Sequence, residues 1–252
     1  MAAGAEPTID ALGQFKLHTV LGGLGASVNF TQSNLVMVVG GALMILLLWF
    51  GMKRRAIIPG RLQSTAELGY KFIYDMSVEQ IGPEGRRYFP FVFTLFFFVL
   101  MGNLLGLLPY SFTYTSHIAV TFALALTVFI LVTIVALLIH GLHFFSYFVP
   151  QGAPKLLIPV LVPIEVISYL SRLISLPVRL FANMVAGHVM MEVFATFLVL
   201  MASAGAVGIF AAIFPQLVNI ILIGFELLVA ALQAYVFALL TCLYLHDAVH
   251  LH

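Results

Sequence analysis

The sequence predicts an all-α integral membrane protein with about five membrane-crossing helices and one amphipathic helix on the membrane surface. Hydrophobic residues make up 62% of the 252 residues, charged residues only 8%, and the mean hydropathy is +1.12. A soluble globule of this length needs far more polar surface. Several apolar stretches exceed the about 20 residues that a helix needs to cross a bilayer, and they lack the alternation of barrel strands. We therefore expect a single membrane domain over residues 1–252.

The composition also excludes several partners and cofactors. A net charge of +1 argues against a nucleic-acid partner. Because Cys242 is the single cysteine, an internal disulfide and a cysteine-built metal site are excluded, and no cofactor is expected. The N-terminal segment, residues 1–32, is mixed and Gly-rich, without the basic start and apolar core of a cleavable signal.

The apolar runs define the first membrane spans. The first covers about Leu35 to Met52 and stops at a basic cluster. A Phe-rich span follows at 89–108 and ends at Pro109, and a further helix is expected at 117–140. A short polar hairpin at 141–154 then leads into the last hundred residues.

Residues 61–81 form a different kind of helix. From Glu67 to Glu79, charged residues recur every four positions on one stripe, and apolar side chains occupy another. Ser64 and Glu67 have the spacing of a capping box. This pattern predicts an amphipathic helix that lies on the membrane surface.

The basic residues predict the orientation of the chain. Seven of the eleven Lys and Arg residues lie in the segment 53–87, between the first two spans. Cytoplasmic loops carry such an excess of positive charge, so this segment is expected in the cytoplasm. Counting spans from there puts the N-terminus outside and the C-terminus in the cytoplasm.

Residues 155–203 and 208–248 are each helical for much longer than one crossing requires. The apolar runs within them would measure roughly 65 Å and 55 Å, against a hydrocarbon core of about 30 Å. Re-entrant hairpins, helices that leave the bilayer, and steep tilt are the three possible explanations. Pro177 and Gly187 can kink a helix but do not form a turn, so two strongly tilted, bent helices are favoured.

Arg179 is the most informative residue of these stretches, because its nearest charged neighbours are Arg172 and Glu192. A cation at the centre of a bilayer costs about 2.5 to 3.5 kcal/mol on insertion scales, so such residues are rare and usually mark ion pathways. A purely structural role, such as fixing a kink beside Pro177, is the alternative.

The helix that carries Arg179 has two polar faces. Glu165, Arg172 and Arg179 are spaced by seven and form one stripe. Asn183 lies about 40° from Arg179, on the same side, whereas His188 points about 180° away. Arg172 could equally lie at the membrane interface.

The last helix repeats the spacing of seven with Asn219, Glu226 and Gln233. A carboxylate among apolar residues needs a partner or a water-filled cavity. Glu226 is therefore expected to have a polar partner or to line such a cavity. His188 is the best candidate, because an imidazole titrates near neutrality and can pass protons. Asn219 shares the stripe and is expected on the same path.

Several other polar residues have ordinary interpretations. Gly102 and Gly106 form a GxxxG pattern that suggests close helix packing, and Asn103 is expected to bond a neighbouring helix. Six further histidines and the acidic residue of the C-terminal tail are expected at the membrane interface: His117, His140, His143, His246, Asp247, His250 and His252.

Three stretches resemble subunit a of F-type ATP synthases. Residues 165–188, EVISYLSRLISLPVRLFANMVAGH, resemble the arginine-bearing helix of that family. Residues 226–241, ELLVAALQAYVFALLT, resemble its last helix, and residues 103–109, NLLGLLP, resemble its third. The resemblance covers nearly everything after Leu35, and the arginine motif is highly specific.

The resemblance implies a proton-translocating stator subunit of a rotary ATP synthase, without catalytic chemistry of its own. It would provide two offset half-channels to and from the carboxylates of a c-subunit ring, with Arg179 facing the ring. Glu165 would lie toward the cytoplasmic exit. The path from the outer side would include Asn183, His188, Glu226 and Gln233. Further implied partners are b-type peripheral stalk subunits and other ATP synthase subunits, in a bacterial cell inner membrane.

Two other functions are compatible with buried polar residues. An ion-coupled secondary transporter would also place charges at the bilayer midplane, but paired repeats and broken helices are not evident here. A haem-binding membrane protein needs two histidines at matched depth on facing helices, and only His188 is expected to lie deep.

Overall fold

The computed structural model describes residues 19–21, 30–53, 59–108, 113–141, 144, 157–203 and 205–250. In chain order the elements are β1 (Thr19–Leu21), β2 (Phe30–Thr31), α1 (Gln32–Lys53), α2 (Arg61–Ile81), α3 (Gly85–Gly106), the 3-10 turn η2 (Tyr114–Ser116), α4 (Ile118–His140), α5 (Ile158–Ala202) and α6 (Ala206–Val249). Five of these helices are long and apolar enough to cross a membrane, all except α2, and this confirms the all-α membrane fold. The antiparallel pair β1–β2 was not expected. Most of the N-terminal segment and of the predicted hairpin at 141–154 lies outside the described residues.

α2 begins three residues earlier than its predicted capping box, which is therefore wrong. Gly60 is the N-cap residue, and its carbonyl accepts the backbone N–H of Ser64 at 2.8 Å, so Ser64 lies inside the first turn. The amphipathic pattern itself is confirmed. The buried residues are Ala66, Ile73, Met76, Ser77 and Ile81. The exposed charged residues include Glu67, Lys71, Asp75 and Glu79.

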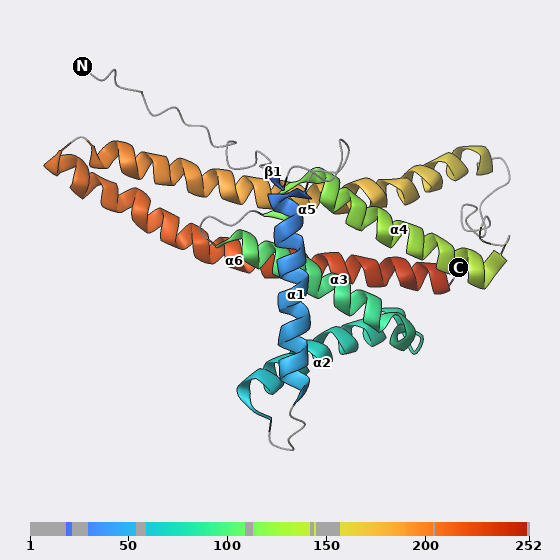
Figure 1. Cartoon of the computed structure of the whole chain (residues 1–252). Coiled ribbons are helices and arrows are strands. Elements are labelled where there is room, and N and C mark those ends of the chain that lie inside the picture. The colour runs from blue at the N-terminus through green and yellow to red at the C-terminus, as the bar shows by residue number, and fades with distance from the viewer. Residues whose placement is uncertain are drawn as a thin grey trace.

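α5 and α6 are unbroken helices of 45 and 44 residues. At 1.5 Å per residue each is about 65 Å long, roughly twice the thickness of a hydrocarbon core. Figure 1 shows them side by side as a long hairpin that extends across the upright α1. Their continuity excludes re-entrant hairpins, which leaves steep tilt, or extension beyond the bilayer, to account for this length.

Ser203 and Gly205 flank the tip of this hairpin. Gly205 has a φ of 92°, a left-handed conformation that favours glycine because it has no Cβ. Beyond the tip, the outer part of α6 presents large apolar side chains to its surroundings. Phe210, Phe214 and Ile221 are each exposed by 70% or more, as expected of residues that face lipid.

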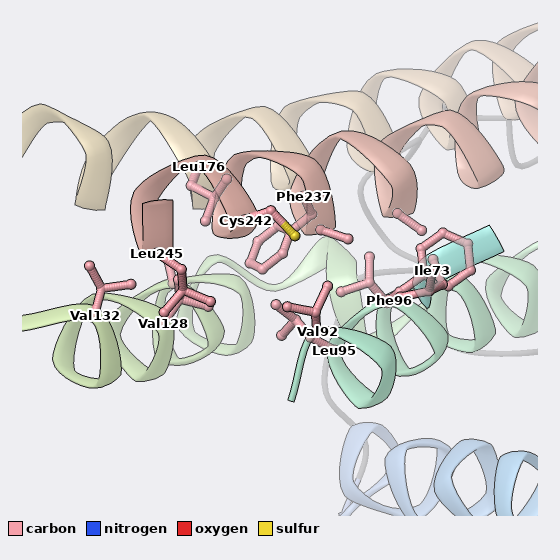
Figure 2. Close-up of a cluster of buried hydrophobic side chains, with 14 of the residues drawn as sticks. Ile73, Val92, Leu95, Phe96, Val128, Val132, Leu176, Phe237, Cys242 and Leu245 are labelled. Carbon is pink, nitrogen blue, oxygen red and sulfur yellow. The ribbon is translucent and has the colours of Figure 1, made fainter. Parts of the chain in front are cut away.

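The hydrophobic core lies where α2, α3 and α4 pack against the other half of the hairpin. Figure 2 shows Val92 and Leu95 of α3, Val128 of α4, and Phe237 and Leu245 of α6 converging there. α4 contributes one face to this core, with buried residues three or four positions apart: Ala125, Val128, Val132 and Ala136. The core therefore holds three helices on one side of the hairpin and leaves part of α5 uncovered.

Candidate functional site

Arg179 lies on the uncovered face of α5, and its side chain is exposed. The exposed positions before and after it on this face carry small side chains: Ser171, Ser175, Ala182 and Ala186. Within the described part of the chain, its guanidinium forms no ion pair. The chain thus presents a permanent cation on a surface that another helix can approach closely.

A hydrogen bond joins α5 to α6 one turn beyond Arg179. Asn183 Nδ2 donates to Gln233 Oε1 at 3.0 Å, and Gln233 is buried between the helices. Asn183 is four residues from Arg179, about 6 Å along the helix axis. The structure therefore brings together two predicted site residues and places the polar stripe of α6 beside the arginine.

The Glu226 carboxylate lies against Gly187, at the next level of the hairpin. A side chain at Gly187 would overlap the carboxylate, because a Cβ built there meets Glu226 Oε2, Cδ and Oε1. Glu226 is only 4% exposed, and its Oε1 accepts no hydrogen bond from any described residue. A buried carboxylate oxygen requires a donor, so this position is suited to an exchangeable partner.

His188 meets a partner that the sequence did not predict. Its Nε2 lies 2.9 Å from Thr113 Oγ1, in the connection between α3 and α4. The sequence predicted Glu226, rather than a threonine, as the partner of this imidazole. Both residues nevertheless lie at one level of the hairpin, because Glu226 contacts Gly187, the neighbour of His188.

Asn219 and Glu165 lie at the two ends of the predicted path. Asn219 is two turns nearer the hairpin tip than Glu226, and its buried Oδ1 accepts no hydrogen bond from the part of the chain described here. Glu165 is partly buried and lies fourteen residues before Arg179, about 21 Å along α5. Glu165 is thus separated from the cluster around Glu226.

Arg172 turns toward α6 and forms an ion pair that the sequence did not predict. Its Nη1 donates to Asp247 Oδ2 at 2.9 Å. Its guanidinium also lies 4.9 Å from the ring centre of Tyr244 and 6.0 Å from that of Tyr169. Arg172 and Arg179 therefore differ in environment although they share a predicted stripe: one is paired within the chain and the other is presented outward.

The C-terminal end of α6 is held by α4. His140 Nε2 lies 3.1 Å from the carbonyl oxygen of Ala248 and 3.2 Å from that of Val249. Carbonyls in the last turn of a helix lack intrahelical partners, so an imidazole donor satisfies them. The sequence predicted only that His140 lies near the membrane interface. It carries no signal for this contact with the C-terminal end of α6.

The GxxxG pattern of α3 has another use than the predicted helix packing. A Cβ at Gly102 would overlap the Tyr114 ring, and one at Gly106 would overlap Thr113. The two glycines thus receive side chains of the α3–α4 connection. The prediction for Asn103 is confirmed, since its Nδ2 donates to the carbonyl oxygen of Ala230 on α6 at 3.1 Å.

No group of three metal-ligating side chains is found among the described residues. His188 bonds Thr113, and His140 bonds the end of α6. The polar groups along α5 and α6 are instead single hydrogen-bonding and ionisable side chains in a row. Such a row is suited to passing protons rather than to holding a bound group.

Comparison with known proteins identifies the family. A family model described as ATP synthase A chain matches residues 34–246. The "ATP synthase subunit a" of Granulibacter bethesdensis is 67% identical over 98% of this chain and 99% of the relative. That of Gluconacetobacter diazotrophicus is 60% identical over 99% of both chains, and that of Rhodospirillum rubrum is 51% identical over 90% and 92%. The chain belongs to the ATP synthase A chain family.

Proposed function

We propose that this chain conducts protons along two offset half-channels that meet at Arg179, beside a rotating ring of c subunits. As a member of its family, the chain is the proton-translocating membrane subunit of an ATP synthase and is not itself catalytic. A secondary transporter is not favoured.

The exposed position of Arg179 is the observation that carries this proposal. A carboxylate on a passing ring must be neutral while it faces lipid and must ionise when it reaches the chain. A fixed cation within about 4 to 6 Å lowers the pKa of a carboxylate by 1 to 3 units, so Arg179 would release the proton. Small side chains around Arg179 allow the ring helix to come that close.

Arg179 would also separate the two half-channels. A guanidinium does not give up its proton at biological pH, so protons cannot pass through it from one side to the other. Each proton must therefore travel with the ring. The membrane potential supplies about 2.3 kcal/mol of free energy per charge per 100 mV. Rotation of the ring adds up this free energy over several protons.

The access path would run along the hairpin from its tip toward Arg179. Asn219, Glu226 with His188, and the pair Asn183–Gln233 follow one another in that order along α5 and α6. Water is a suitable donor for the buried Glu226 oxygen, and would connect the carboxylate to the outer side. Glu165, on the opposite side of Arg179, would belong to the exit path.

The basic segment 53–87 supports an orientation with the N-terminus outside and the C-terminus in the cytoplasm. The three relatives above are bacterial, which favours a bacterial inner membrane as the location of this multi-pass protein. The peripheral stalk would be built from b-type subunits. These subunits would hold the chain still while the ring turns.

Arg179→Ala in the assembled ATP synthase tests this proposal. We expect normal membrane insertion and assembly but no proton-driven ATP synthesis, because ring carboxylates no longer ionise beside the chain. Ser175→Ala, one turn away on the same exposed face, is the matched control and should leave synthesis unchanged. Coupled synthesis at the parent rate in assembled Arg179→Ala complexes would show that Arg179 has no such role.

A further inference from the structure

The end of the connection between α3 and α4 that precedes α4 is built into the protein interior. Residues 113–116 are all buried, although they join two membrane spans. Tyr114 occupies the space beside Gly102 and donates its hydroxyl to the carbonyl oxygen of Phe98 at 2.6 Å. Thr115 Oγ1 donates to Asn103 Oδ1 at 2.8 Å, and Asn103 in turn bonds α6. These contacts fix the segment to α3 and to the hairpin.

Thr113 is the residue of this segment that reaches the proposed proton path. Its carbonyl oxygen accepts the Ser116 hydroxyl at 2.6 Å and the Ser116 backbone N–H at 3.1 Å. Its side chain fills the space beside Gly106, and its Oγ1 lies 2.9 Å from His188 Nε2. Hydrogen bonds to the Thr113 carbonyl oxygen and packing beside Gly106 of α3 therefore position the Thr113 hydroxyl independently of the histidine.

We propose that Thr113 is a positioning residue of the proton access path, and that its hydroxyl holds the His188 imidazole for proton transfer. This inference rests on the proposed role of His188. A hydroxyl can donate to the neutral Nε2 and can accept from the Nε2–H of the imidazolium, so Thr113 serves both protonation states. The contact places one ring nitrogen of His188 at a fixed hydroxyl beside the proposed path.

Other titratable groups lie on α5 and on the elements that pack against it. They are Glu226 on α6, which lies against Gly187, Glu192 four residues along α5, and Tyr114 and His117 just before α4. A substitution at Thr113 alters none of these groups chemically. A shift of the pH profile in Thr113→Val that is not seen in Thr115→Val is therefore assigned to the imidazole that Thr113 contacts.

The test uses inside-out membrane vesicles that contain the complete ATP synthase. ATP-driven acidification and passive proton flux are measured between about pH 5 and 8, where histidine titrates. Thr113→Val keeps the shape but removes the hydroxyl, and Thr113→Ser keeps the hydroxyl. Thr115→Val is the matched control, because it removes a neighbouring buried hydroxyl that contacts Asn103 and not His188.

We expect Thr113→Val to lower proton flux about fivefold to tenfold, since a hydrogen bond of this kind contributes about 1 kcal/mol. The pH midpoint of the flux should shift as well. Thr113→Ser should restore both the rate and the midpoint, and Thr115→Val should leave the midpoint unchanged. In a His188→Ala background, Thr113→Val should add no further change.

An unchanged pH profile in Thr113→Val, or an equal shift in Thr115→Val, would overturn the inference. If Thr113→Val does not assemble, Thr113→Ala removes the hydroxyl with less steric demand and is judged by the same criteria. His188→Ala separates the two proposals. If it leaves flux and pH profile unchanged, the proposed path is wrong; if it alters both while the Thr113 variants do not, only the positioning role is wrong.

Discussion

Gly187→Ala is the sharpest perturbation of the proposed path, because it acts on Glu226 without changing any polar residue. The new Cβ would overlap the Glu226 carboxylate, at distances that real Cβ contacts do not show. The carboxylate lies at the far end of a flexible side chain, so it can retreat by rotation. To reach an ordinary van der Waals distance from the new Cβ, the carboxylate must move by more than about 1 Å. A displacement of that size can lower the rate of a reaction that depends on positioned groups about 100-fold.

Stability should change much less than proton flux in this variant. Overpacking costs about 1 to 3 kcal/mol, and replacing glycine by alanine within a helix returns roughly 0.5 to 1 kcal/mol. The Asn183–Gln233 hydrogen bond still holds α5 to α6 nearby. We therefore expect normal assembly together with a loss of proton flux of about 10-fold to 100-fold.

The assay is ATP-driven acidification of inside-out vesicles, followed by quenching of a pH-sensitive dye and normalised to assembled complex. Gly224→Ala is the matched control, since a Cβ at this glycine of α6 meets no atom within 4 Å. Glu226→Asp, combined with Gly187→Ala, draws the carboxylate back by about 1.5 Å and should restore part of the flux. Full flux in assembled Gly187→Ala complexes would refute the reasoning that Glu226 acts from this position.

Two further predictions concern stability. Arg172→Ala and Asp247→Ala should each lower the free energy of unfolding by about 1 to 2 kcal/mol, and the double variant by less than their sum, because they share one partly exposed ion pair. Thermal unfolding in detergent measures this, and additive effects would contradict a shared pair. Burial lowers the pKa of His117, just outside α4, so the folded state binds fewer protons there than the unfolded state. The free energy of unfolding should therefore fall as the pH drops below about 6.5, and it should fall less in His117→Gln. If the pH dependence in His117→Gln is identical to that of the parent protein, burial of His117 is not the cause.

The helices, and the helix faces that carry the candidate site residues, could be predicted because their signals are local. Apolar runs and basic flanks define spans within one segment, and the two 45- and 44-residue helices were recognised from uninterrupted apolar sequence. The seven-residue spacing placed Arg179 and Glu226 on helix faces in the same way. The capping box at Ser64 was wrong, because the helix begins at Arg61 with Gly60 as its N-cap and Ser64 lies inside the first turn.

Contacts between distant segments could not be predicted in this way. The partner of Arg172 could have been a lipid headgroup, solvent or a carboxylate, and Asp247 became the partner only through the antiparallel packing of α5 and α6. Thr113 carried no recognisable pattern, because a threonine in a connecting segment is ordinary. Its contact with His188 depends on the two glycines of α3 that admit residues 113–116.

The sequence by itself determined the class of the protein, the helices that carry charge, and the residues that require an explanation in lipid. These follow from composition and periodicity, which are properties of one segment at a time. Only the tertiary structure decided what each polar group meets. Rotation and register between helices set those contacts, and so they left Arg179 facing outward, paired Arg172 within the chain, and placed Thr113 on the imidazole of His188.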